Sequence, residues 1–175
     1  MQKNILLKVA LVFLILTSLT FYPLHPPQVS AATTDTFDII VQGEYLYIDI
    51  TNTSWNLGVV AMGSHHWTNE TGVTWIADLD NTSVNTDLSL QITNDAADWS
   101  AATSGNGPGA DVYRLNASSD SWSTEYQIVT ASDTVIASNI PAGNNQTFDT
   151  RFDAPTSTST GDQQTITITA TLAKH

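Results

Sequence analysis

The chain contains no cysteine and few basic residues. Among its 175 residues, 17 are Asp or Glu and only 5 are Lys or Arg, for a net charge of −12 at pH 7. Without thiols the chain forms no disulfides. A surface this acidic repels phosphate groups, so we expect neither nucleic acid nor anionic lipid as a partner. An adaptation to high salt is the alternative explanation for the acidity.

Sequence motifs of catalysis are also missing. The chain has no G-x-S-x-G, no H-E-x-x-H and no glycine-rich phosphate loop beside a lysine. The glycine-rich stretch "SGNGPG" at residues 104–109 has no basic neighbour. A pair of carboxylates for glycoside cleavage stays open, because spacing in a sequence does not fix the distance between two groups. We therefore expect a protein that is not an enzyme and has no cofactor, with calcium left open.

The long hydrophobic run lies at the N-terminus. Lys3 and Lys8 precede an apolar run over residues 9–21, and the prolines of "YPLHPPQ" follow it. The run is shorter than the roughly 20 residues that a spanning helix needs, and "VSA", ending at Ala31, offers small residues to a signal peptidase. We expect residues 1–31 to be a cleaved signal peptide and the protein to be secreted, either extracellular or on the cell surface. No membrane span is expected after cleavage; an uncleaved anchor is the alternative.

The rest of the chain, residues 32–175, is predicted to be a single domain made of strands. Apolar and polar residues alternate, as in "TDLSLQITN", where Leu88, Leu90 and Ile92 share one face. Such alternation is typical of antiparallel sheets with one packed face and one wet face, and turn signals recur about every dozen residues. The predicted fold is an all-β antiparallel sandwich, immunoglobulin-like, with about eight or nine strands. Strand-like runs cover residues 37–41, 44–51, 56–61, 72–79, 86–93, 111–117, 124–130, 134–138, 146–152 and 163–172, the weakest being edges or fragments.

Three stretches carry a resemblance to a known family. They are "WNLGVVAMGS", "LDNTSVNTDLSLQITN" and "ASNIPAGNNQTFDTRFDAPTSTSTGDQQTITITATL". Their order of strand and turn signals resembles that of the immunoglobulin-like domains of bacterial and archaeal secreted and cell-surface proteins. The resemblance spans residues 55–172. It implies a structural or adhesive role, and it brings no functional residues to transfer.

The stretch "MGSHHWTNETGVTW" (62–75) gathers two of the 4 histidines of the chain. Neighbouring residues of a strand point to opposite faces, so His65 and His66 are poorly placed to bind one metal ion. Glu70 is the nearest third ligand, and no helix is predicted that would bring it to their side. We expect the histidines to lie in a connection between strands, with a metal site or a pH-sensitive contact as the alternative.

Two groups of aspartates lie near predicted turns. Calcium binds oxygen ligands of this kind. The stretch "DLDNTS" (78–83) begins like a calcium loop but lacks the glycine at the sixth position and the later glutamate. We expect solvated turn carboxylates, and the metal ligands remain unassigned. The two groups are Asp78, Asp80 and Asp87, and Asp95, Asp98 and Asp111.

Aromatic residues and glycosylation signals supply further candidates. Of the 5 tryptophans, Trp67 and Trp122 have polar neighbours and are the candidates for stacking on a sugar, with core or edge packing as the alternative. Asn-x-Ser/Thr sequons mark candidate glycosylation sites in a secreted protein, although several arise by chance in a chain this rich in Asn, Ser and Thr. The sequons are at Asn52, Asn69, Asn81, Asn116 and Asn145.

The leading functional prediction is a secreted, non-catalytic surface protein that serves as the structural subunit of an extracellular assembly, such as a filament, sheath or coat. Self-association would use strand exchange, because sheet edges are templates for another chain. In "TTDTFDIIV" (33–41), Phe37, Ile39 and Val41 would be the assembly contacts; pairing within its own domain is the alternative. Two other functions stay open: a carbohydrate-binding module with a surface glycan as partner, and a calcium-stabilised adhesin domain.

Overall fold

A computed structural model describes residues 38–175. The strands of these residues lie in one compact unit, Gln42–His175, and residues 38–41 belong to a separate N-terminal unit. The predicted signal peptide, residues 1–31, and Phe37 lie outside the described residues. Signal cleavage and export therefore stay predictions from the sequence.

The regular secondary structure of the described residues is almost entirely β. They form ten strands and no α-helix, with one 3-10 turn at Asn69–Thr71. A membrane-spanning helix is not found among residues 38–175. The predicted all-β class is confirmed.

The larger sheet has seven strands joined by backbone hydrogen bonds. They are β1 (Asp49–Thr51), β2 (His65–Trp67), β3 (Trp75–Asp78), β5 (Ser100–Ala101), β6 (Val112–Ser118), β7 (Tyr126–Ile128) and β9 (Gln146–Asp153). Their order is β1-β3-β9-β6-β5, with β2 also paired to β9 and β7 to β6. Because β3 pairs with residues 146–148 and β2 with residues 151–153, these two strands share one edge of β9. Among the described strands, only the β5–β6 pair is parallel.

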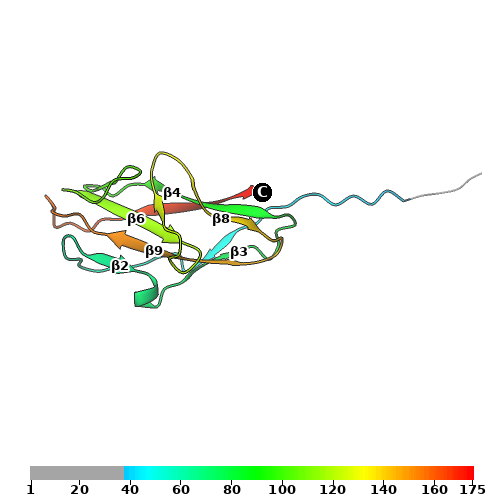
Figure 1. Ribbon diagram of the computed structural model, residues 1–175, viewed down its shortest axis with the longest axis horizontal. Helices are drawn as coiled ribbons and strands as arrows, with labels where there is room; N and C mark the ends of the chain where they lie inside the picture. Colours follow the sequence, from blue (N-terminus) through cyan, green and yellow to red (C-terminus); the bar gives the residue numbers. More distant parts are fainter. Residues whose placement is uncertain (1–37) are drawn as a thin grey trace, which may run out of the picture. The chain divides into compact units, whose positions relative to one another are not determined.

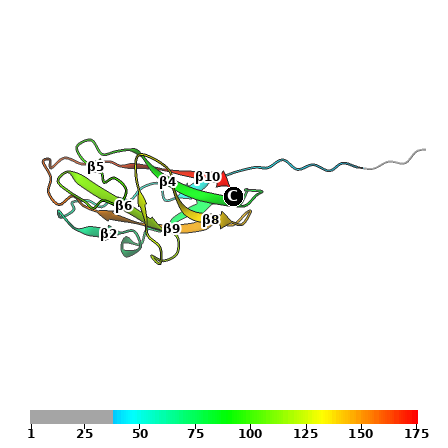
Figure 2. The same cartoon turned by 45° about the horizontal axis from the view of Figure 1, so that its top comes forward.

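The smaller sheet has three antiparallel strands. They are β10 (Thr167–Lys174), β4 (Thr86–Asn94) and β8 (Thr134–Ile140), in the order β10-β4-β8. Figures 1 and 2 show β10 running beside β4 in one layer, and β9 between β6 and β2 in the other. β10 and β8 are therefore the two edges of this sheet.

The alternating side chains build one apolar core between the two sheets. In β4, Leu88 is 0% exposed, and Leu90 and Ile92 are 1% exposed. In β9, Phe148 and Phe152 are 6% and 5% exposed. The inward residues of both strands belong to a single buried cluster. The alternation predicted for these two strands is thus the alternation that packs the core.

Three segments differ from the prediction. Of the predicted strand at 37–41, the described residues 38–41 form no strand. Residues 56–61, predicted as a strand, form none either, and no strand occurs between residues 52 and 64. His65 and His66, predicted to lie in a connection, are instead part of β2, because the end of β9 supplies their backbone partners. A strand forms only where another strand lies beside it, and the pattern of one segment does not reveal its partner.

Candidate functional site

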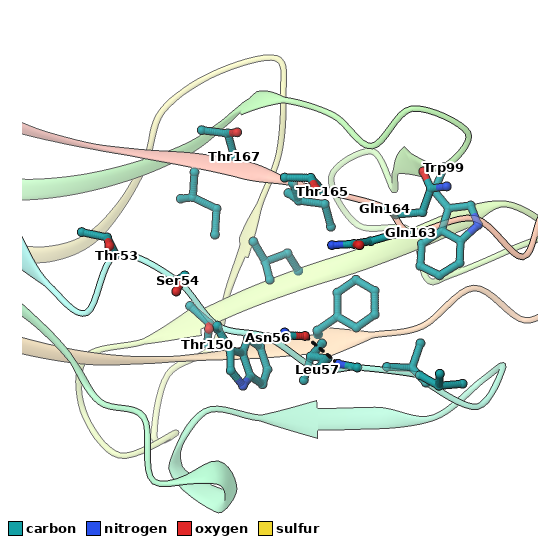
Figure 3. Close-up of a pocket in the computed structure, with 18 of the residues that line it drawn as sticks. Thr53, Ser54, Asn56, Leu57, Trp99, Thr150, Gln163, Gln164, Thr165 and Thr167 are labelled. Atoms are coloured by element: carbon teal, nitrogen blue, oxygen red, sulfur yellow. Dashed lines mark hydrogen bonds between the residues drawn. The ribbon is translucent and has the colours of Figure 1, made fainter.

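A groove opens between the two sheets along β10. Its volume is about 1250 Å³. One wall is formed by residues 158–170, which lead into β10, and the other by residues 52–62, which follow β1. Figure 3 shows Thr165 and Thr167 on the first wall and Ser54 on the second. The groove therefore lies where the predicted strand at 56–61 is missing.

The floor of the groove is the apolar core itself. Leu90 from β4, Leu115 from β6 and Phe152 from β9 line it, although none of them is more than 5% exposed. Asp162 is the one charged residue in the lining. Because an unpaired charge is costly to bury, the groove favours an uncharged occupant, and its apolar floor favours apolar side chains.

The apolar face of β10 is less covered than that of its neighbour β4. Ile168, Ala170 and Leu172 are only partly buried, whereas the inward residues of β4 are fully buried. β10 pairs with β4, and its other edge has no partner strand among the described residues. That edge presents unpaired backbone N–H and C=O groups beside the groove.

The opposite wall is held in place by side chains. Asn52 Nδ2 donates a hydrogen bond to the carbonyl of Thr74 at 2.9 Å, and Trp55 Nε1 donates to Thr71 Oγ1 at 3.0 Å. Within the described part of the chain, residues 52–60 form no backbone–backbone hydrogen bond with another segment. Both walls of the groove thus carry backbone groups that lack a strand partner.

Just before the compact unit, the chain exposes consecutive large apolar residues. Ile39 is 77% exposed, Ile40 is 93% exposed and Val41 is 85% exposed. Phe37, the third predicted assembly contact, lies outside the described residues. Contiguous exposed apolar surface is a feature of interaction sites.

A second feature lies on the outer face of the larger sheet, where both arginines of the chain meet one carboxylate. Arg114 Nε donates a hydrogen bond to Asp153 Oδ2 at 2.7 Å, and Arg151 Nε donates to Asp153 Oδ1 at 2.9 Å. His65 Nδ1 lies 2.7 Å from the same Oδ1. Asp153 is fully buried. We call these four residues the arginine cluster; it joins β2, β6 and β9.

The guanidinium of Arg151 also packs on the two tryptophans predicted as sugar-stacking residues. It lies 5.9 Å from the ring centre of Trp67 and 6.0 Å from that of Trp122, and it forms an ion pair with Glu125. The electrostatic attraction between a guanidinium and an aromatic face stabilises such contacts. The other three tryptophans, Trp55, Trp75 and Trp99, line the groove.

Two opposing effects act on the pKa of Asp153. Burial raises it, but hydrogen bonds from Arg151, Arg114 and His65 outweigh burial and hold the pKa below its ordinary value of 3.8. As the pH falls, the unfolded chain therefore takes up a proton at this residue before the folded protein does.

We expect the free energy of unfolding to fall as the pH drops below about 5. A carboxylate whose pKa is lower in the folded state stabilises the protein above the unfolded pKa, and this stabilisation is lost as the pH falls through the folded pKa. Hydrogen bonds also lower the pKa values of Asp87, Asp111 and Asp120, so these groups act with the same sign.

Urea unfolding of the wild type and of Asp153→Asn at about pH 6 and about pH 3 measures this dependence. The variant should lose less stability on acidification, because it lacks one of the titrating groups. Equal losses in both proteins would show that the lowered pKa of Asp153 has no part in acid denaturation.

The other predicted metal ligands are not brought together. His66 Nε2 lies 2.8 Å from Ser64 Oγ, and Glu70 is exposed in the 3-10 turn. Among residues 38–175, no three His, Asp or Glu side chains gather as a metal site would require. The histidines therefore have protein partners that explain their positions.

Five of the six aspartates in the two groups accept hydrogen bonds through their carboxylates. Asp78 Oδ1 accepts from the backbone N–H of Asp80 at 3.0 Å, and Asp95 Oδ1 accepts from the hydroxyl of Tyr113 at 2.6 Å. Similar contacts join Asp87 to Asn139, Asp98 to Gln164 and Asp111 to Ser159. Each of these carboxylates thus has a structural role without an ion.

The five sequons differ in exposure. Asn116 is 2% exposed, as is Ser118 of the same sequon, so the folded domain hides this site. The asparagines of the other four sequons are exposed; they are Asn52, Asn69, Asn81 and Asn145.

Sequence reasoning did not identify Arg114, Arg151 and Asp153 as a group. The one available signal was scarcity: the chain has two arginines, and Arg151 and Asp153 share the polar face of an alternating strand. The contact with Arg114 depends on the pairing of β6 with β9, which places Arg114 opposite Asp153.

Comparisons with protein-family models, with curated proteins and with solved structures found no match to this chain.

Proposed function

We propose that this protein is a secreted, non-catalytic structural subunit of an extracellular assembly, in which the domain is an immunoglobulin-like sandwich that lacks one strand. Subunits join when a strand from one molecule fills the groove of another. The observation that carries the proposal is the open groove, because its floor is the hydrophobic core and its walls have unpaired backbone groups.

The dimensions of the groove favour a chain segment over a small molecule. Small-molecule pockets usually enclose roughly 300–1,000 Å³, and this groove has about 1250 Å³. Its lining is almost uncharged, with Asp162 as the exception. An extended peptide meets both conditions, because its backbone pairs with a sheet edge and its alternate side chains fill the apolar floor.

The donated strand is the N-terminal segment around Ile39. In an extended conformation, Phe37, Ile39 and Val41 point to one face and Asp38 and Ile40 to the other. The segment therefore offers three large apolar side chains to a groove and leaves its charged residue on the outside.

The carbohydrate-binding alternative has weaker support. Trp67 and Trp122 do come together, but both rings pack on Arg151. The arginine cluster by itself explains their positions.

Deletion of residues 32–41 tests the proposal. The shortened chain should remain folded, because the compact unit Gln42–His175 contains the strands and the core, but it should no longer assemble. Electron microscopy of the secreted parent chain and of the deletion variant measures assembly, and circular dichroism checks the fold. A deletion variant that still forms filaments or sheets, or a parent chain that forms neither, would contradict the proposal.

A further inference from the structure

We infer that the free edge of β10 is the acceptor for residues 35–42 of a second copy of this chain, and that the donated strand becomes the fourth strand of the smaller sheet. This inference rests on the proposed function and specifies the two surfaces that meet.

Among the described strands, those with a free edge are β1, β2, β5, β7, β8 and β10, and the groove distinguishes them. β10 borders the groove through Thr167, Ile168 and Ala170, whereas no residue of β2, β5, β7 or β8 lines it. β1 also borders the groove, but it is only 3 residues long, against 8 residues for β10. At roughly 3.4 Å per residue, the edge of β10 extends about 27 Å, which matches the length of the donated segment.

The side chains of β10 fit a strand on this edge. Its threonines, at 167, 169 and 171, are exposed, and Ile168 and Ala170 line the groove. A donated strand in the same sheet places Ile39 and Val41 beside Ile168 and Ala170, over the floor formed by Leu115 and Phe152. Ile40 then lies on the outer face beside the threonines.

The connection between the N-terminal segment and β1 favours a donor strand from another molecule. The ion pair between Glu44 and Lys174 places residue 44 at the C-terminal end of β10, and Tyr45 is anchored there by a hydrogen bond from its N–H to Ser83 Oγ at 2.7 Å. A hairpin that folded the segment into the groove of its own molecule would need a tight turn in this connection. Residues 42–48 form no turn, and Gly43 is not among the glycines with positive φ.

Engineered cysteines test the edge, because the chain contains none of its own. The outer face is chosen so that an oxidant can reach the thiols. In neighbouring antiparallel strands, the Cα atoms of paired residues lie about 4.5–5.5 Å apart, which is within the Cα–Cα range of a disulfide. The full secreted chain carries Ile40→Cys together with either Thr169→Cys or Thr171→Cys, which covers two registers.

The matched control uses the other edge of the same sheet. Ser89 of β4 pairs with Thr171 of β10 on one side and with Val135 of β8 on the other, and Val135 is 46% exposed. Val135 therefore lies opposite the same residue of β4 as Thr171, but on β8, the edge that does not border the groove. Ile40→Cys combined with Val135→Cys is the control.

The assembled variants are oxidised and separated on a non-reducing gel. At least one β10 variant should give a ladder of covalent oligomers that collapses on reduction, and the Val135 variant should assemble without a crosslink and run as a monomer on the gel. A ladder from the Val135 variant, closure within single chains, or no crosslink from either β10 variant would overturn the inference while leaving assembly itself intact. If the cysteine-free parent forms no assemblies, the proposed function fails as well.

Discussion

Replacement of Ile39 by aspartate should abolish the proposed assembly of this chain, while the same replacement at Ile40 should leave that assembly intact. The two residues are adjacent and both are highly exposed before assembly, at 77% and 93%. They point to opposite faces of an extended strand. Of these two residues, only Ile39 enters the groove in the proposed joint.

The expected loss of assembly is large, because the substitution replaces a side chain whose burial stabilises the joint with one whose burial destabilises it. Burial of an isoleucine side chain stabilises by about 1.5–3 kcal/mol, and a carboxylate in the same apolar place has no partner to offset its lost hydration. A change of about 3 kcal/mol or more weakens each joint roughly 100-fold. Light scattering and electron microscopy measure assembly, and urea unfolding should show equal domain stability for both variants. Equal assembly of the two variants would argue against the alternation on which strand exchange depends.

Replacement of Asp153 by asparagine should lower the free energy of unfolding by about 3 kcal/mol. The change removes the charge to which Arg114, Arg151 and His65 all bind. Two guanidinium groups then remain side by side, with Glu125 as the neighbouring counter-ion of Arg151. Removal of one partner from a buried ion pair is costly because the other charge stays buried without compensation. We expect the lower part of the usual range, since the side chain of Arg114 is 29% exposed.

Asp133→Asn is the control for this variant. It makes the same chemical change at an exposed position in the turn before β8, where a substitution typically changes stability by less than about 0.5 kcal/mol. Urea unfolding at neutral pH measures both variants. A loss for Asp153→Asn no larger than that of the control would show that the arginine cluster is a surface ion pair of little energetic weight.

Much of the fold could be predicted from side-chain alternation, and the exceptions have a common cause. Leu88, Leu90 and Ile92 alternate in the sequence because β4 lies between two strands and packs one face on the core. Residues 56–61 show a strand-like pattern as well, but the place beside them is an open groove. His65 and His66 have no such pattern, yet they form a strand because β9 offers a free edge to them. Alternation reports which face would be buried; it does not report whether a partner strand is present.

The two candidate sites were predictable to different degrees. The apolar alternation of Ile39 and Val41 is visible in the sequence, and so it predicted a donor segment. The acceptor was not predictable, because the groove is lined by residues as far apart as Ile50 and Ala170. The arginine cluster was missed for a similar reason: the partners of Asp153 come from residues 65, 114 and 151 and meet only through strand pairing.

Because the groove and the exposed segment are different parts of the molecule, each joint in the proposed assembly is head-to-tail. Contacts of this kind close into a ring only if the rotation between neighbours returns to its start; otherwise they continue as an open fibre. Such a fibre is polar. The molecule at one extremity keeps a vacant acceptor and the molecule at the other keeps an unused donor, so the two tips differ chemically. Elongation could then be stopped at either tip by a molecule that has one half of the joint and lacks the other.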